Sequence, residues 1–92
     1  MATWDERKRR ANVKRHGLDF EGFEEIWDNP TITREDIRFR YGEPRYVTFG
    51  LLNGDVVVLV HTERDKDTHV ISLRRAERYE ERYYFETTGK IR

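Results

Sequence analysis

The side chains best suited to chemistry lie in two short segments, His61-Thr62-Glu63-Arg64 and Ser72-x-Arg74. They combine two guanidinium groups with a carboxylate and an imidazole. Such a set has the parts for cleaving RNA without a metal. A base removes the proton of the 2′-hydroxyl, guanidinium groups hold the extra charge at the phosphorus centre, and an acid protonates the leaving 5′-oxygen. We expect the segments to lie on neighbouring strands, so they could form one site.

Each role in this chemistry has candidates. His61 or Glu63 could be the base, and Arg64 and Arg74 could clamp the phosphate. The stacking surface or the acid could come from either of two tyrosines, Tyr46 and Tyr83. A solvated histidine at a strand end is a simpler interpretation of His61, because most such residues have no catalytic role.

The stretch from Arg45 to Ala76 must position these residues. Asn53-Gly54 between two apolar runs predicts a hairpin with a type I′ turn, since both turn residues need a positive φ. A two-residue loop fixes the register and pairs Tyr46 with His61. The third strand is expected from His69 to Leu73, and a helix from Arg74 onward.

Alternation of side chains along the hairpin separates two faces. The apolar set predicts the core face: Val47, Phe49, Leu51, Val56, Val58 and Val60. The other face is mixed and comprises Tyr46, Thr48, Val57, Leu59, His61 and Glu63. We therefore expect function on the mixed face.

The N-terminal half is expected to supply two helices. Asp5 as N-cap and Gly17 after the last turn predict a helix over residues 6–16. Asp19 is expected to cap a second short helix. Its Phe20, Phe23 and Trp27 recur at helical spacing and are predicted to be core. Alternating residues over 36–41 predict a short strand or arm.

Composition limits the class of protein. The 92 residues predict one domain over 1–92, with enough apolar and aromatic material for a core. The sequence has no cysteine, and its histidines lack metal-ligand spacing, so neither a disulfide framework nor a metal or other cofactor is expected. No apolar run reaches the length of a membrane span, and no signal peptide is visible, which favours a cytoplasmic chain. Basic residues dominate 1–16 and acidic residues 17–44, and either surface could bind a partner.

Several spaced motifs resemble the BrnT family of bacterial type II toxins. They run in the order Trp4-Asp5-Glu6-x-Lys8, Asn12, Lys14-x-His16-Gly17-Leu18-x-Phe20, Gly42-Glu43-x-Arg45-Tyr46, Gly50, Gly54, Thr62-Glu63-Arg64 and Ile71-Ser72-x-Arg74-x-Ala76. The resemblance covers nearly the whole chain. It implies an α+β RelE-like fold, with a short first strand, two helices, an antiparallel sheet of about four strands and a C-terminal helix.

The resemblance also implies a function. Such a toxin is a metal-independent endoribonuclease that cleaves RNA and blocks translation until a BrnA-like antitoxin neutralises it. That antitoxin carries a ribbon-helix-helix domain, so operator DNA is contacted only through it, and no membrane is involved. Arg64, Arg74, Glu63 and His61 are the expected catalytic residues. The expected RNA-binding residues are Tyr46, Arg45, His69, Tyr83 and Lys14.

Two positions depart from the pattern that the resemblance implies. His69 stands where such proteins usually have a basic residue, often Arg, and His61 stands where they commonly have Tyr. The first departure supports an alternative, namely a catalytically weak or inactive module that only partners a DNA-binding antitoxin in an autoregulatory complex. The second moves Arg64 and Arg74 ahead of His61 as candidates.

Overall fold

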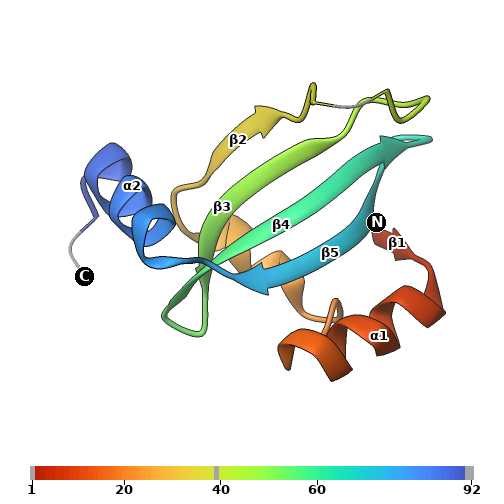
Figure 1. Ribbon diagram of the computed structural model, residues 1–92, viewed down its shortest axis with the longest axis horizontal. Coiled ribbons are helices and arrows are strands. Elements are labelled where there is room, and N and C mark those ends of the chain that lie inside the picture. The colour runs from red at the N-terminus through yellow and green to blue at the C-terminus, as the bar shows by residue number, and fades with distance from the viewer. Residues whose placement is uncertain (1, 39, 91–92) are drawn as a thin grey trace.

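A computed structural model describes residues 2–38 and 40–90 as a small α+β fold with a five-stranded mixed sheet (Figure 1). In chain order the elements are β1 (Ala2–Trp4), α1 (Glu6–His16), the 3-10 helix η1 (Phe23–Asp28), β2 (Ile32–Glu35), β3 (Tyr46–Leu52), β4 (Asp55–Arg64), β5 (Asp67–Arg75) and α2 (Arg78–Thr88). The strand order is β1-β5-β4-β3-β2, with β1 parallel to β5 and the other pairs antiparallel. The α+β class is confirmed. The predicted sheet was antiparallel with about four strands, whereas the observed sheet has a fifth strand, β1, that is parallel to its neighbour.

The central hairpin has the predicted register. Asn53 and Gly54 both have positive φ, at 51° and 80°, as a type I′ turn requires. Leu52 pairs with Asp55, and Tyr46 pairs with His61. A second two-residue turn at Asp65 and Lys66, again with positive φ, joins β4 to β5. The register of the whole β3-β4-β5 meander therefore follows from two tight turns.

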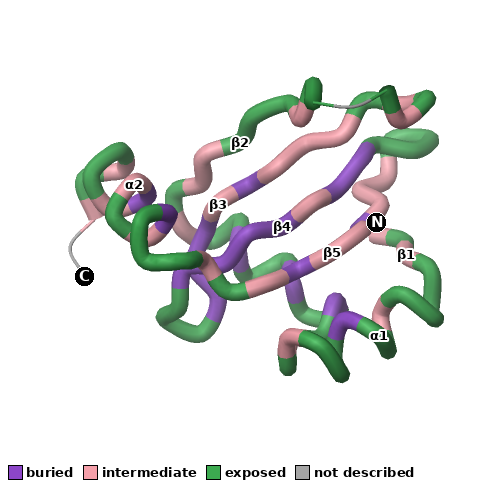
Figure 2. The backbone as a smooth tube through the Cα atoms, in the orientation of Figure 1, coloured by how far each residue is buried: buried purple, intermediate pink, exposed green. Residues whose placement is uncertain are grey.

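Helix α1 begins and ends where its caps predict. Asp5 Oδ1 accepts hydrogen bonds from the backbone N–H groups of Arg7 and Lys8, and Gly17 adopts the left-handed conformation at the other end. Most of the helix is exposed (Figure 2). Its buried residue is Asn12, whose amide donates to Leu73 O at 2.7 Å and accepts from Leu73 N at 3.1 Å. The pairing of β1 with β5 extends no further along β5 than Val70. The Asn12 side chain therefore supplies the hydrogen bonds to Leu73 that a longer β1 would make.

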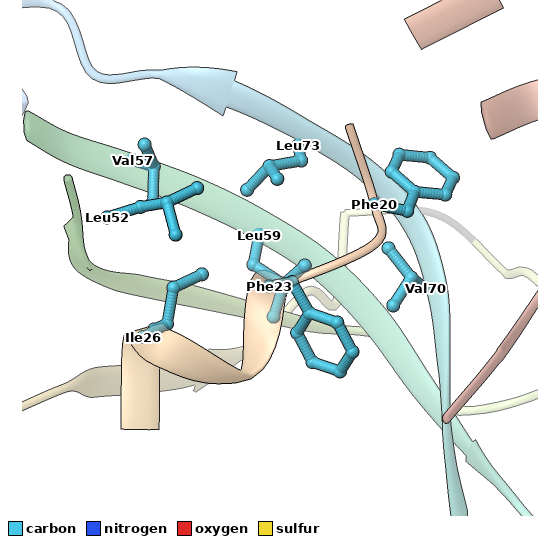
Figure 3. Close-up of a cluster of buried hydrophobic side chains, with 8 residues drawn as sticks. All are labelled: Phe20, Phe23, Ile26, Leu52, Val57, Leu59, Val70 and Leu73. Carbon is cyan, nitrogen blue, oxygen red and sulfur yellow. The ribbon is translucent and has the colours of Figure 1, made fainter. Parts of the chain in front are cut away.

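The main core lies between the sheet and η1 (Figure 3). The cluster comprises Phe20, Phe23, Ile26, Leu52, Val57, Leu59, Val70 and Leu73. Gly50 lies directly under η1, and a Cβ at this position would stand 2.4 Å from Ile26 Cγ2. Glycine therefore permits the close approach of η1 to β3.

This arrangement places the main core on the sheet face that was expected to carry the function. We call the face bearing Val57, Leu59 and His61 the packed face, because α1 and η1 cover it. The opposite face was predicted to be the core. Leu51, Val56 and Val58 are buried there, and Tyr84 of α2 packs on the first two. Val47, Phe49 and Val60 stay half-buried, and we call this face the open face.

Three local predictions are wrong. The second helix is a 3-10 helix that begins at Phe23, and its buried residues are Phe23 and Ile26. Phe20 and Phe23 are core as predicted, whereas Trp27 is 43% exposed. The edge strand is Ile32–Glu35 instead of residues 36–41, of which Phe39 lies outside the described residues. Arg74 lies within β5 instead of beginning a helix, because Val58 pairs with Arg74 and Val57 with Arg75.

Candidate active site

The open face carries a cleft between α2 and the edge strand β2. Its volume is about 510 Å³. The floor is apolar and comes from the two central strands, with Val47, Phe49, Val58 and Val60. The walls are polar: Arg34 and the residues up to Arg38 line one side, and Arg74, Tyr79 and Glu80 line the other. An apolar floor between walls that carry arginines can bind a planar base and its phosphate together.

Arg74 is held rigidly on its wall by Glu80. Nη1 and Nη2 of Arg74 lie 2.8 Å and 2.9 Å from the two carboxylate oxygens. Glu80 also accepts from the backbone N–H of Glu77 in a capping box at the start of α2. The hydrogen bond from Arg74 lowers the pKa of Glu80 despite burial, and the same bond raises the pKa of Arg74. Both groups are therefore charged at neutral pH.

Arg34 faces Arg74 across the cleft and is placed by α2. It donates a hydrogen bond from Nη2 to the Tyr83 hydroxyl, and its Cζ lies 4.8 Å from the centroid of that ring. Phe49 supports the same ring edge-on at 5.7 Å. Tyr79, one turn earlier, is 67% exposed at the mouth of the cleft. Two arginines and Tyr79 thus line the cleft, and Tyr83 lines its continuation beside Arg34.

The expected meeting of Arg64 with Arg74 is wrong. Arg74 pairs in register with Val58, whereas Arg64 pairs with Asp67 beside the turn. Six positions along β4 correspond to about 20 Å at roughly 3.3 Å per residue. In an antiparallel hairpin the residues flanking the turn are neighbours, so a residue at the far end of β5 lies at the far end of β4 too.

Arg64 instead belongs to a second polar group at the other end of the open face. Its Nη2 lies 2.7 Å from Glu43 Oε1 in the loop before β3. His69, another predicted RNA-binding residue, pairs in register with Thr62, and its Nδ1 lies 2.8 Å from Thr3 Oγ1. Burial and the charge of Arg64 lower the pKa of His69.

His61, Glu63 and Tyr46 lie on the packed side of the sheet, away from both arginines. The His61 side chain is buried, with Nε2 2.8 Å from Thr48 Oγ1, and Nδ1 is buried without a hydrogen-bond partner. The centroid of its ring lies 5.8 Å from that of the Tyr46 ring and 6.0 Å from that of the Trp27 ring. Burial lowers the pKa of His61, so the imidazole is neutral at pH 7. The predicted grouping of His61 and Glu63 with the two arginines is therefore wrong.

The two remaining predicted RNA-binding residues are not in the cleft. The Arg45 guanidinium stacks 4.1 Å above the Tyr41 ring, and its Nε is buried without a hydrogen-bond partner. Lys14 is exposed on α1, in the layer behind the sheet. Of the nine predicted site residues, Arg74 lines this cleft and Tyr83 lines its continuation beside Arg34 and Phe49.

Sequence reasoning missed Arg34, Tyr79 and Glu80. Arg34 was missed because the edge strand was placed a few residues too late. In Ile32–Glu35, Ile32 and Arg34 alternate with Thr33, and this pattern could have placed Arg34 beside Phe49 and Val47. The Glu77–Glu80 spacing of a capping box was also present in the sequence.

A family model described as ribonuclease toxin, BrnT, of type II toxin-antitoxin system matches residues 4–80. The chain belongs to the BrnT family. A search of curated proteins gave no match. As a BrnT-family chain it is a member of a group of ribonuclease toxins, which implies an RNA target and an antitoxin partner. The matched range includes Arg34, Arg74 and Glu80.

Two further findings concern only the part of this BrnT-family chain that the structure describes. No helix within residues 2–38 and 40–90 has both the length and the apolar character to cross a membrane. The same residues contain no group of three or more His, Cys, Asp or Glu side chains arranged to hold a metal ion.

Proposed function

We propose that this BrnT-family chain is an endoribonuclease that binds and cleaves RNA in the cleft of the open face. The observation that carries the proposal is the placement of Arg34 and Arg74 on opposite walls of one apolar-floored opening. Guanidinium groups bind phosphate oxygens in pairs, and they stabilise charge that grows in the transition state. Tyr79 at the mouth offers an exposed ring on which a base can stack.

The proposed reaction needs no external reactant. The 2′-oxygen attacks the adjacent phosphorus as its proton passes to a base, and the bond from phosphorus to the 5′-oxygen breaks. The 5′-oxygen takes up a proton, and the products are a 2′,3′-cyclic phosphate and a 5′-hydroxyl. Arg34 and Arg74 hold the phosphate throughout.

One proton-transfer group comes from the cleft in this proposal. Glu35 borders the cleft but pairs in register with Tyr46, whose side chain lies on the packed face, so we name no residue as the base. The Tyr83 hydroxyl, held by Arg34, is the candidate acid. Glu80 is a positioning residue, because its carboxylate is engaged by Arg74 and Glu77. The catalytic roles predicted for Arg64, Glu63 and His61 stay predictions, and the separation of these residues from Arg74 ranks them behind the cleft.

The biological part of the proposal follows the family. We propose that cleavage occurs in the cytoplasm, stops translation and is neutralised by a BrnA-like ribbon-helix-helix antitoxin, through which operator DNA is reached. The RelE-like character of the fold remains a prediction. Metal independence is tested by adding EDTA, which should leave cleavage unchanged.

The double variant Arg34→Gln plus Arg74→Gln tests the site. We expect cleavage of RNA to fall by about 10²-fold or more, because two phosphate ligands are lost. A matched control, Arg10→Gln plus Arg15→Gln, removes the same charge from exposed positions of α1. Circular dichroism and thermal unfolding verify that each variant is folded. Equal cleavage by the two double variants would refute the site.

A second candidate function is a binding module that no longer cleaves RNA. It is favoured by one observation: Arg74 and Arg64 are each engaged by a carboxylate, from Glu80 and Glu43. Purified protein that leaves RNA intact but binds its antitoxin tightly would support this function. Cleavage by the wild-type chain that the cleft variant abolishes would exclude it.

A further inference from the structure

A polar group lies on the open face at the end remote from the cleft. It consists of Arg64 at the end of β4, Glu43 in the loop before β3, and His69 on β5, beside Thr3 of β1. Alternation along β4 places Arg64 on the same side of the sheet as Val58 and Val60, which form part of the cleft floor. The group and the cleft therefore share one surface.

Arg64 is fixed in place yet still open to solvent. Glu43 engages it at two atoms, with Nε 3.2 Å and Nη2 2.7 Å from the two carboxylate oxygens. The Arg64 side chain nevertheless remains 48% exposed. A guanidinium has five N–H donors, so a bidentate carboxylate leaves donors for a second anion. Preorganisation by Glu43 lowers the entropic cost of binding that anion.

His69 adds a second polar side chain near Arg64. Its Nδ1 is hydrogen-bonded with the Thr3 hydroxyl, and Nε2 is the ring nitrogen that we assign to a phosphate oxygen. The loop that carries Glu43 is held against this end of the sheet, because the Thr62 hydroxyl donates to Pro44 O. The loop and β5 thus border the polar group on two sides.

The surface between the group and the cleft suits a strand of nucleic acid. Val60 and Ser72 face each other there across β4 and β5, and both are half-buried. Thr62, the next open-face residue of β4 toward Arg64, is fully buried. About 20 Å separate the register positions of Arg74 and Arg64, at roughly 3.3 Å per residue. A stacked single strand advances about 3.4 Å per nucleotide, so about six nucleotides cover this distance, and an extended strand needs fewer.

We propose that Arg64 and His69 form a second phosphate-binding subsite, and that the substrate is a single-stranded RNA long enough to reach it from the cleft. The inference rests on the proposed function, since it assumes that the scissile phosphate lies between Arg34 and Arg74. Arg64 thereby contributes to affinity and to the choice of substrate length, and the chemical step takes place about 20 Å away. In this proposal Arg64 and Arg74 bind different phosphates of one RNA strand, so they need not lie close together.

Binding of non-cleavable 2′-O-methyl oligonucleotides tests the subsite. An eight-nucleotide strand can span both ends at about 3.4 Å per nucleotide, and a three-nucleotide strand cannot. We expect Arg64→Gln to weaken binding of the long strand by about 3- to 10-fold and to flatten the slope of log affinity against log salt by about 0.7. Arg64→Lys should retain the slope, and the short strand should bind both variants like wild type.

The control is Arg10→Gln, which removes one positive charge from exposed α1 and should change neither strand's affinity. The subsite is refuted if Arg64→Gln leaves the salt slope of the long strand unchanged, or if it weakens both strands alike. Wild-type protein that binds neither strand refutes the proposed function and this inference with it. Wild-type protein that binds both strands with the same affinity refutes the inference alone.

Discussion

Arg74 and Glu80 form a two-point ion pair, Nη1 to Oε1 at 2.8 Å and Nη2 to Oε2 at 2.9 Å, that joins the last residues of β5 to the first turn of α2. The same carboxylate caps the helix through the backbone N–H of Glu77. One side chain therefore fixes both the start of α2 and the direction of a cleft arginine. The helix also carries Tyr79 and Tyr83, so the pair aligns most of one cleft wall.

Glu80→Gln should reduce both stability and cleavage. The amide keeps one acceptor for the Glu77 N–H but loses the charged pair, so we expect the free energy of unfolding to fall by about 1–3 kcal/mol. Because Arg74 lowers the pKa of Glu80, wild-type stability gained from this pair is present above about pH 4.5 and is lost as the pH falls through the folded-state pKa. Urea unfolding at several pH values measures this, and Glu86→Gln on exposed α2 is the control. An unchanged unfolding free energy at pH 7 would contradict it.

Asn12→Ala should weaken the attachment of α1 to the sheet. The substitution leaves the N–H and carbonyl of Leu73 without the partners that lie 3.1 Å and 2.7 Å away. Unpaired buried groups of this kind cost about 1–3 kcal/mol. Hydrogen exchange of Leu73 N–H should accelerate, whereas Ala substitution of exposed Arg10 should not affect it. Asn12→Asp should also destabilise, because a carboxylate cannot donate to Leu73 O.

Gly50→Ala should destabilise through a single contact. The new methyl would stand 2.4 Å from Ile26 Cγ2, and such overpacking costs about 1–3 kcal/mol. The double variant Gly50→Ala plus Ile26→Ala should be more stable than the sum of the two single effects predicts, since alanine at position 26 removes the clashing atom. Additive losses of unfolding free energy in a double-mutant cycle would contradict this prediction, because they would show that the clash is relieved elsewhere.

Acidification should destabilise the fold through His61. Burial lowers the pKa of His61 in the folded state below its usual 6.5, so protonation favours the unfolded chain. Stability should therefore be complete above about pH 6.5 and should fall as the pH drops below it. His61→Gln keeps a donor for Thr48 and should flatten this dependence in chemical unfolding. The pKa of His69 is also lowered, so His69→Gln is measured alongside to separate its contribution.

The sequence predicted helix ends and tight turns correctly where the local backbone geometry favours a few residue types. Asp5 and Gly17 set the ends of α1, and Asn53-Gly54 set the hairpin. These features depend on hydrogen bonds and dihedral angles within a few residues. They need no knowledge of the rest of the chain.

The choice between the two sheet faces could not be made the same way. Strand β4 reads Val56 to Val60 as a continuous apolar run, so both of its faces are apolar and alternation does not rank them. The decision depends on where α1 and η1 pack, and that depends on long-range contacts such as Ile26 against Gly50. Because the packed face was misassigned, His61 and Glu63 were grouped with arginines from which the sheet separates them.

The site itself depended on register over longer distances. Ser72 and Val60 pair directly, but the next residues shift by one, and His61 pairs with Val70. Arg64 and Arg74 were expected to meet because they lie on consecutive strands. The β4-β5 pairing instead places them at opposite ends of the two strands. Arg74 and Tyr83 could be predicted as candidates from residue type, but their partners Glu80 and Arg34 required the positions of α2 and β2.

The alternation along β4 also has a consequence for how this chain tolerates change. Leu59 belongs to the interior shared with η1, while its neighbours Val58 and Val60 line the floor of the cleft, so adjacent residues of β4 are constrained by different parts of the structure. Substitutions at Val60 can alter what is bound with little effect on the interior. A single inserted residue in the middle of β4 would exchange the two sets, and fold and activity would be lost in one event.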